Sequence, residues 1–186
     1  IQLEEEFGEI PNKLKLINCV GGGSSAYGLW SEFIDYNKNQ IELIGVEAGG
    51  PKNSKLHAAP LSKNSKIAIL HGAAAYCVQD SDGQINETES CSSGLDYPSC
   101  SPIHCYLKDT DRAKYTDATD EEAFSAYKLV TELEDISPSL EPAHAFAEAI
   151  KIAPKLSDST IIVVNSCGDS LKDRDIIKKY LGSYSR

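Results

Sequence analysis

The stretch Leu14-Lys15-Leu16-Ile17-Asn18-Cys19-Val20-Gly21-Gly22-Gly23-Ser24-Ser25-Ala26 decides the fold of this chain. Its first seven residues are mostly apolar and predict a buried strand. Residues 26–34 carry apolar side chains at helical spacing, so the glycines and serines connect a strand to a helix. Such a loop can hold a phosphate, because glycines allow close backbone approach and the N–H groups at a helix N-terminus point at the oxygens. An ordinary glycine-rich turn is the alternative.

The rest of the chain continues this alternation of strands and helices. Residues 41–47 and 160–165 are apolar and predict two further buried strands, and residues 67–71 are another strand candidate. Thr119 and Glu122 have the spacing of a capping box that opens a helix. Further helices are expected after Ser139, as its N-cap, and near residues 102–108 and 173–180. This order predicts an α/β fold with a mostly parallel sheet.

The composition of the chain indicates a globular protein and argues against some classes of partner. The chain has 186 residues, of which 41% are hydrophobic and 25% charged, and this suits one globular domain. Its formal net charge of −10 argues against nucleic acid and against an anionic membrane surface as partners. The six cysteines contain no CxxC pair, so we expect free thiols in a reducing, cytoplasmic compartment. A zinc site from Cys91, Cys100 and Cys105 is the alternative.

Two predicted strands end in small polar residues. In a parallel sheet, ligands lie outside the carboxyl ends of the strands, so Cys167 is expected near whatever the loop of residues 21–25 holds. The same loop fits G-x-G-x-x-A through Gly21, Gly23 and Ala26, and Glu47 ends the next strand. An acidic residue there binds ribose hydroxyls in dinucleotide-binding domains, so an NAD-binding domain is the alternative function.

Other candidate side chains carry weaker signals. Asp96, between Gly94 and Pro98, is a carboxylate that a long loop could hold rigidly at a site. Glu141 can act simply by stabilising the first turn of its helix. The four histidines are scattered, and we expect surface or core roles for them, namely for His57, His71, His104 and His144.

Taken in order, several segments resemble the tryptophan synthase β family over nearly the whole chain. These are Cys19-Val20-Gly21-Gly22-Gly23-Ser24, Leu43-Ile44-Gly45-Val46-Glu47, Ala59-Pro60-Leu61, Asp82-Gly83-Gln84-Ile85, Ser93-Gly94-Leu95-Asp96-Tyr97-Pro98, Thr119-Asp120-Glu121-Glu122-Ala123, Leu140-Glu141-Pro142-Ala143-His144-Ala145 and Val163-Val164-Asn165. The resemblance implies a three-layer α/β domain, the C-terminal part of a pyridoxal phosphate lyase of tryptophan biosynthesis that joins L-serine and indole to give L-tryptophan and water.

The resemblance also implies roles for individual residues. It implies that the cofactor is bound by Gly21, Gly22, Gly23, Ser24, Ser25, Glu141 and Cys167. It places Cys167 near the pyridine nitrogen of the cofactor. Gly94 and Asp96 are placed at the substrate. Backbone carbonyls of Gly21, Tyr97 and Ser99 are placed at a monovalent cation. An α subunit and a β–β dimer are the implied partners.

Several departures from the family limit this expectation. Ser25 stands where the family usually has Asn, Cys167 where it has Ser, and Asp169 where an Arg-Gly pattern begins. The family's Schiff-base lysine follows a histidine in an N-terminal half, and no His-Lys pair occurs here. We therefore assign no catalytic residue in this chain, treat residues 1–186 as one domain without the lysine-bearing half, and expect no activity from it alone.

Overall fold

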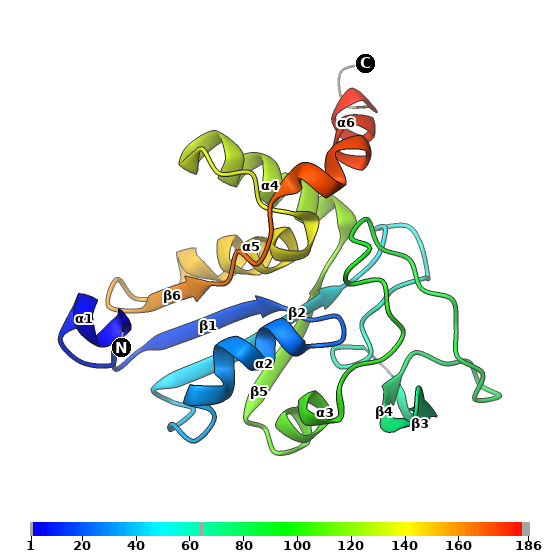
Figure 1. Cartoon of the computed structure of the whole chain (residues 1–186), viewed down its shortest axis with the longest axis horizontal. Coiled ribbons are helices and arrows are strands. Elements are labelled where there is room, and N and C mark those ends of the chain that lie inside the picture. Colours follow the sequence, from blue (N-terminus) through cyan, green and yellow to red (C-terminus); the bar gives the residue numbers. More distant parts are fainter. Residues whose placement is uncertain (1, 64, 184–186) are drawn as a thin grey trace.

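The computed structural model describes residues 2–63 and 65–183. Within them, the centre of the fold is a sheet in which β5 (Ala113–Ala118), β2 (Ile41–Ala48), β1 (Leu14–Cys19) and β6 (Ile161–Val164) lie side by side in that order (Figure 1). All neighbouring strands of this sheet are parallel. The predicted parallel α/β sheet is confirmed.

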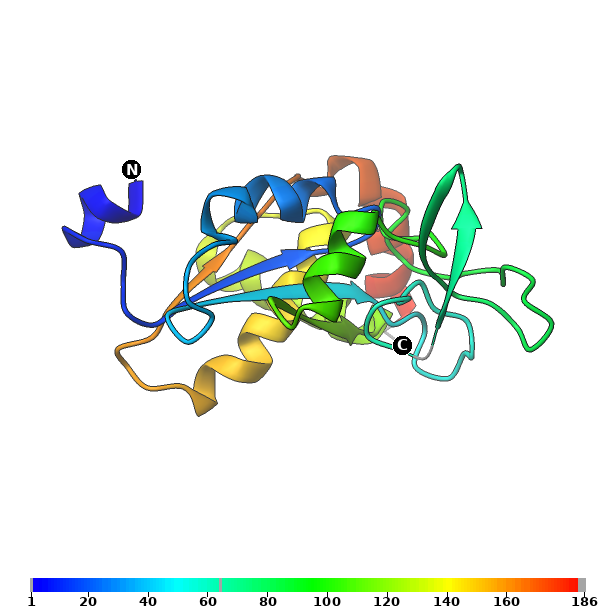
Figure 2. The ribbon, with the colours of Figure 1, turned by 90° about the horizontal axis from the view of Figure 1, so that it is seen from below.

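Helices cover both faces of the sheet and give the expected three layers (Figure 2). α2 (Ser24–Trp30) and α3 (Pro102–Asp109) lie on one face, and α5 (Leu140–Ile152) lies on the other. α4 (Asp120–Glu134) packs against α5. The site expected at the strand ends is therefore framed by helices from both layers.

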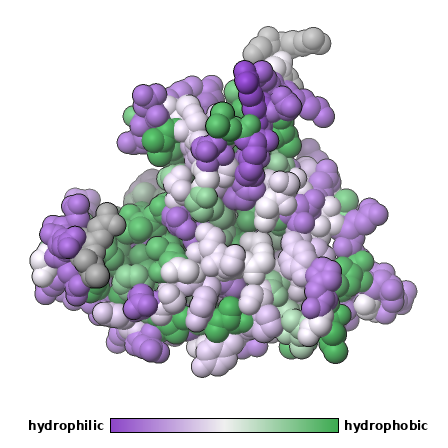
Figure 3. All heavy atoms as spheres, in the orientation of Figure 1, coloured by the Kyte–Doolittle hydropathy of each residue, from purple (hydrophilic) through white to green (hydrophobic). Residues whose placement is uncertain are grey.

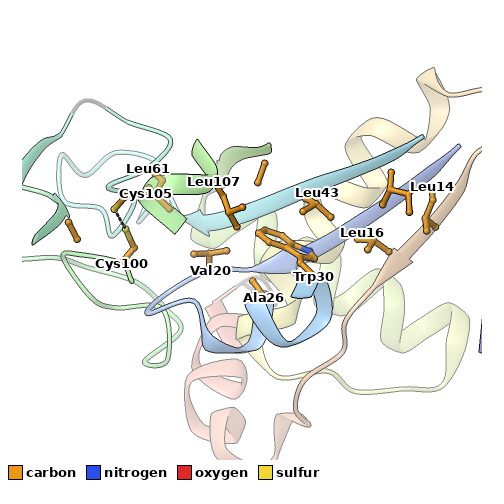
Figure 4. Packing of buried hydrophobic residues seen from close by; sticks show 13 residues of the cluster. Leu14, Leu16, Val20, Ala26, Trp30, Leu43, Leu61, Cys100, Cys105 and Leu107 are labelled. Atoms are coloured by element: carbon orange, nitrogen blue, oxygen red, sulfur yellow. Dashed lines mark hydrogen bonds between the residues drawn. The ribbon is translucent and has the colours of Figure 1, made fainter. Parts of the chain in front are cut away.

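Alternate residues of β1 face the two layers, as the geometry of a strand requires. Leu14 and Leu16 pack with Trp30 of α2 (Figure 4), whereas Ile17 and Cys19 belong to the cluster beneath α5. Trp30 is fully buried. Because both faces are covered, apolar residues occur on both sides of β1, and Lys15 and Asn18 interrupt the run.

The strand expected at residues 67–71 forms, but not in the main sheet. β3 (Lys66–Leu70) pairs antiparallel with β4 (Ala73–Cys77) in a separate hairpin. Its turn residues, His71 and Gly72, have φ of 49° and 82°, as the common two-residue hairpin turn requires. Ile69 is 80% exposed, so this apolar run lies on the surface and not in the core of the main sheet.

Strand β5 is absent from the sequence-based prediction. Its residues are largely polar, and its burial comes from pairing with β2. Tyr115 packs over Gly45, where a Cβ would lie 2.7 Å from the tyrosine ring. A glycine is therefore required in the neighbouring strand.

The predicted helix starts are confirmed, but one helix is capped by a different residue than expected. Thr119 and Glu122 form both bonds of the capping box. Ser139 is the N-cap of α5, but its side chain makes no capping hydrogen bond. Instead, the N–H of Leu140 donates to the Asp173 carboxylate over 2.8 Å. A distant residue thus replaces the local cap.

The remaining elements lie at the ends of the layers. They are α1 (Gln2–Phe7), the short 3₁₀ helices η1 (Ser31–Phe33), η2 (Ala153–Lys155) and η3 (Ser170–Asp173), and α6 (Arg174–Ser183). Figure 3 shows hydrophobic side chains gathered beside α1, where β1 and β6 begin. None of the described helices is long and apolar enough to cross a bilayer.

Candidate functional site

The structure brings the glycine loop and the Cys167 segment together. β1 and β6 are neighbours, so the loop after β1 lies beside the segment after β6. The Ser25 hydroxyl accepts a hydrogen bond from Asn165 Nδ2 over 3.1 Å and a longer one from Asn18 Nδ2 over 3.4 Å. The two asparagines therefore fix the position of Ser25 at the strand ends.

The loop of residues 21–25 presents unused backbone donors. Among the described residues, the N–H groups of Gly21, Gly22, Gly23, Ser24 and Ser25 have no hydrogen-bond acceptor. Gly22 is exposed, and a Cβ built on it meets nothing within 4 Å. Consecutive free N–H groups make a concave site for an anion.

His104 sets the conformation of this loop from α3. Its Nε2–H donates to the Gly23 carbonyl over 2.8 Å, and its Nδ1 accepts from the Tyr115 hydroxyl over the same distance. Burial lowers the pKa of His104 and favours this neutral form. Gly23 has φ of 101°, and a Cβ there would lie 2.1 Å from the imidazole. The expected core role of His104 is confirmed, but its contact with the loop was not predicted.

The long segment before α3 returns to the same loop. A Cβ on Gly21 would lie 2.6 Å from the Gly94 carbonyl oxygen, so two backbones touch at this point. The N–H of Ser101 donates to the Gly22 carbonyl over 3.0 Å. Asp96 is exposed, with its N–H bonded to the Ser92 carbonyl. Gly94 and Asp96 therefore lie on the loop that borders the glycines.

Glu141, at the start of α5, joins this segment to the region after β6. Its Oε1 accepts from the Gly94 N–H over 2.9 Å and from Lys172 Nζ over 2.6 Å. Burial pushes the pKa of Glu141 up, but the hydrogen bonds to its carboxylate, of which that from Lys172 contributes most, together outweigh burial and leave the pKa at about 2. Its Oε2 is buried without a hydrogen-bond partner in the described part of the chain. Glu141 thus stays ionised and has one free acceptor.

Cys167 lies against a second thiol. Its Sγ is 3.8 Å from that of Cys19. Cys19 is buried and its pKa is raised, whereas a hydrogen bond from Cys19 lowers the pKa of the exposed Cys167 to about 6. At neutral pH Cys167 is therefore a thiolate and Cys19 the donor.

The backbone carbonyl groups that are expected to bind a cation are not used in hydrogen bonds among the described residues. Within residues 2–63 and 65–183, the carbonyls of Gly21, Tyr97 and Ser99 accept no hydrogen bond. The Tyr97 hydroxyl lies 2.9 Å from His71 Nδ1, and Ser99 is buried with its hydroxyl bonded to the Tyr76 carbonyl. The side chains are thus engaged elsewhere.

Glu47 does not lie where a ribose would need it. Its carboxylate is buried and accepts from the N–H groups of Leu61 and Ser62 and from the Ser62 hydroxyl. Burial raises its pKa to about 7. The proposed reading of Glu47 as a ribose ligand is wrong, because this carboxylate anchors a loop instead.

The cysteines are free, as expected, but they do not form the alternative zinc site. Cys100 and Cys105 face each other with 3.5 Å between their sulfur atoms. Cys91 lies elsewhere, in the cluster of α4, α5 and α6.

Of the residues at this site, sequence reasoning missed Lys172 and His104. Lys172 is 31 residues from its partner Glu141, and His104 is 81 residues from Gly23. No local pattern marks either residue, because only the folded chain creates these contacts.

No protein-family model matches the chain. It is 43% identical over 183 residues to the tryptophan synthase beta chain of Chromobacterium violaceum, a match that covers 98% of this chain and 45% of that protein. A fungal L-serine ammonia-lyase from Rhizomucor miehei shares the fold, with a TM-score of 0.62 at 18% identity over 96% of this chain and 53% of that one. This chain is therefore a homologue of the tryptophan synthase beta chain and spans less than half of that relative's length.

Proposed function

We propose that this chain supplies the phosphate-binding part of a pyridoxal phosphate site in a tryptophan synthase of the β type. The observation that carries the proposal is the run of N–H groups from Gly21 to Ser25 without acceptors in the described structure. A phosphate dianion needs several donors, and backbone N–H groups at a glycine loop supply them without a cationic side chain. The 43% identity to a tryptophan synthase beta chain supports this choice of ligand.

Two further side chains fit the rest of the cofactor. Glu141 has a buried, unpartnered oxygen, and Cys167 places its sulfur against Cys19 in the segment after β6. In this proposal Gly21, Gly22, Gly23, Ser24 and Ser25 bind the phosphate, Cys167 lies at the pyridine nitrogen, and Glu141 lines the pocket. When bound, the cofactor acts as an electron sink for replacement at the β-carbon of serine.

The neighbouring loop would serve the substrate and a cation. Gly94 and Asp96 border the glycine loop, and Asp96 is exposed to a ligand. The free carbonyls of Gly21, Tyr97 and Ser99 are suitable donors for a monovalent cation, because hard cations prefer oxygen ligands.

The complete reaction requires groups from outside this chain. The proposed activity is a lyase reaction of tryptophan biosynthesis in the cytoplasm, which converts L-serine and indole to L-tryptophan and water. It needs a Schiff-base lysine that we assign to no lysine of this sequence. We therefore propose that the chain alone is inactive, and that an α subunit and a second β chain are partners of the whole enzyme.

Calorimetric titration tests this proposal. The chain should bind pyridoxal phosphate saturably, bind pyridoxal much more weakly, and show no binding of NAD. Gly22→Asp should weaken pyridoxal phosphate binding at least tenfold, because it adds a carboxylate beside the free N–H groups. Gly28→Asp, which lies within α2 and is also without a neighbour within 4 Å, is the matched control. Equal affinity for pyridoxal, or saturable NAD binding that Glu47→Ala abolishes, would contradict the proposal.

A further inference from the structure

Three potential metal ligands from separate segments meet outside the site described above. Cys91 lies in the long segment before α3, Asp120 is the first residue of α4, and His144 lies on α5. One ligand atom from each, namely the Cys91 Sγ, an Asp120 carboxylate oxygen and a His144 ring nitrogen, lies within 4.8 Å of the others. The proposed cofactor site uses none of these side chains.

His144 is oriented as a metal ligand is. Its ring is fully buried, and Nδ1 lies 2.7 Å from the Leu140 carbonyl oxygen. A carbonyl can only accept, so Nδ1 carries the proton and Nε2 has the free lone pair. Nε2 is buried and has no hydrogen-bond partner among the described residues. A backbone carbonyl that fixes the other ring nitrogen is the usual support of a metal-bound histidine.

Cys91 and Asp120 complete the donor set. The N–H of Cys91 donates to Asp120 Oδ1 over 3.1 Å, so one backbone contact holds the two residues together. Burial raises the pKa of both the thiol and the carboxyl group, because each anion loses its hydration. A divalent cation at this point would stabilise both anions.

A path for an ion exists beside these residues. A surface cavity of about 320 Å³ has Cys91, Asp120 and Phe124 in its wall. Cys91 itself is 8% exposed. Solvent in the cavity can therefore supply the ion and a water ligand.

We propose that Cys91 Sγ, the Asp120 carboxylate and His144 Nε2 bind Zn²⁺, with a water molecule as the fourth ligand. A thiolate, an imidazole and a carboxylate are the ligand types that this borderline-soft ion accepts. Bonds of about 2.0 to 2.3 Å place tetrahedral ligand atoms about 3.3 to 3.8 Å apart, so the ligand atoms need to approach each other by at most about 1.5 Å. On binding, the thiol proton leaves to solvent as the S–Zn bond forms.

The ion would stabilise the neighbouring contact between Gly94 and Glu141. Cys91 precedes Gly94 by three residues, and His144 follows Glu141 by three. A metal bound to Cys91 and His144 therefore links the two segments that this hydrogen bond joins. Its role is structural, and it does not depend on the proposed cofactor.

Titration with Co²⁺, a spectroscopic substitute for Zn²⁺, tests the site in the purified protein. The complex should show a thiolate-to-Co²⁺ charge-transfer band that one equivalent of Zn²⁺ abolishes. Cys91→Ala should remove the band, and Asp120→Asn should weaken binding at least tenfold. Cys105→Ala is the control, since it removes the thiol that faces Cys100.

Circular dichroism should show that the variants are folded, and Zn²⁺ should raise the Tm of the wild type but not of Cys91→Ala. If Cys91→Ala does not fold, His144→Gln replaces it in both measurements. The proposal is overturned if the folded wild type gives no charge-transfer band. It is also overturned if the band survives Cys91→Ala or disappears with Cys105→Ala.

Discussion

The N–H of Gly94 donates to Oε1 of Glu141 over 2.9 Å, and a Cβ on Gly94 would lie 2.4 Å from the same oxygen. The contact therefore requires glycine at position 94. It fixes the segment that carries Asp96 to the start of α5, and Lys172 neutralises the carboxylate from the other side. Glu141 thus connects three segments that are distant in sequence.

Lys172→Gln should raise the pKa of Glu141 above its value of about 2, because the main favourable partner of the carboxylate is lost. In the wild type, this lowered pKa adds stability that is present above about pH 4.5 and is lost as the pH falls toward 2. The variant should lose about 1 kcal/mol at pH 7, since Lys172 is half-exposed. Carbon NMR of the carboxyl group gives the pKa. Lys151→Gln, which removes the pair of a half-exposed lysine with Glu148 elsewhere on α5, should leave it unchanged.

Gly23→Ala should lower the free energy of unfolding by about 3 kcal/mol or more, because the added Cβ meets the His104 ring at a backbone φ of 101°. Gly22→Ala should change it by less than about 1 kcal/mol, since nothing lies within 4 Å. Urea unfolding of the two variants measures both values. Equal losses in the pair would show that His104 does not fix the loop.

Cys167 should react with iodoacetamide faster than the other cysteines, with a rate that rises around pH 6. It is the exposed cysteine, and the Cys19 thiol stabilises its anion. Cys19→Ala should move the midpoint toward the ordinary value of about 8.5. Mass spectrometry of the labelled peptides identifies the site. A midpoint near 8.5 in the wild type would contradict the assigned hydrogen bond.

Glu47→Gln should flatten the dependence of stability on pH between about 4.5 and 7. The folded pKa of Glu47 is raised to about 7 by burial, so its contribution is full below the unfolded value near 4.5 and is lost as the pH rises through 7. This change amounts to at most about 3 kcal/mol. Urea unfolding of both proteins at pH 5 and pH 7.5 gives the difference. A parallel pH dependence in wild type and variant would refute it.

The sequence alone predicts those elements of the fold that are marked by a run of apolar residues or by a local motif. β1, β2 and β6 are apolar runs, and the glycine loop and the capping box of Thr119 have local signatures. β5 was missed because its polar residues become a strand only beside β2. The sequence predicted β3 as a strand but not its pairing in a separate hairpin, because a short apolar run does not reveal which partner it pairs with.

The candidate site likewise has features that the sequence predicts and features that only the folded structure reveals. The position of Cys167 beside the loop followed from parallel strand ends, since β1 and β6 are neighbours. The anchors of the site, His104 and Lys172, depend on contacts across the folded chain. The ribose role of Glu47 failed because its burial under Leu61 and Ser62 has no signature in the strand itself.

The most direct test of the proposed function follows the N–H groups of Gly21, Gly22, Gly23, Ser24 and Ser25 by ¹H–¹⁵N NMR during titration with pyridoxal phosphate. These five signals should shift together and saturate, as their protons bind the phosphate, and pyridoxal without phosphate should leave them in place. Signals that stay unmoved with pyridoxal phosphate, or that move equally with pyridoxal, would contradict the phosphate site.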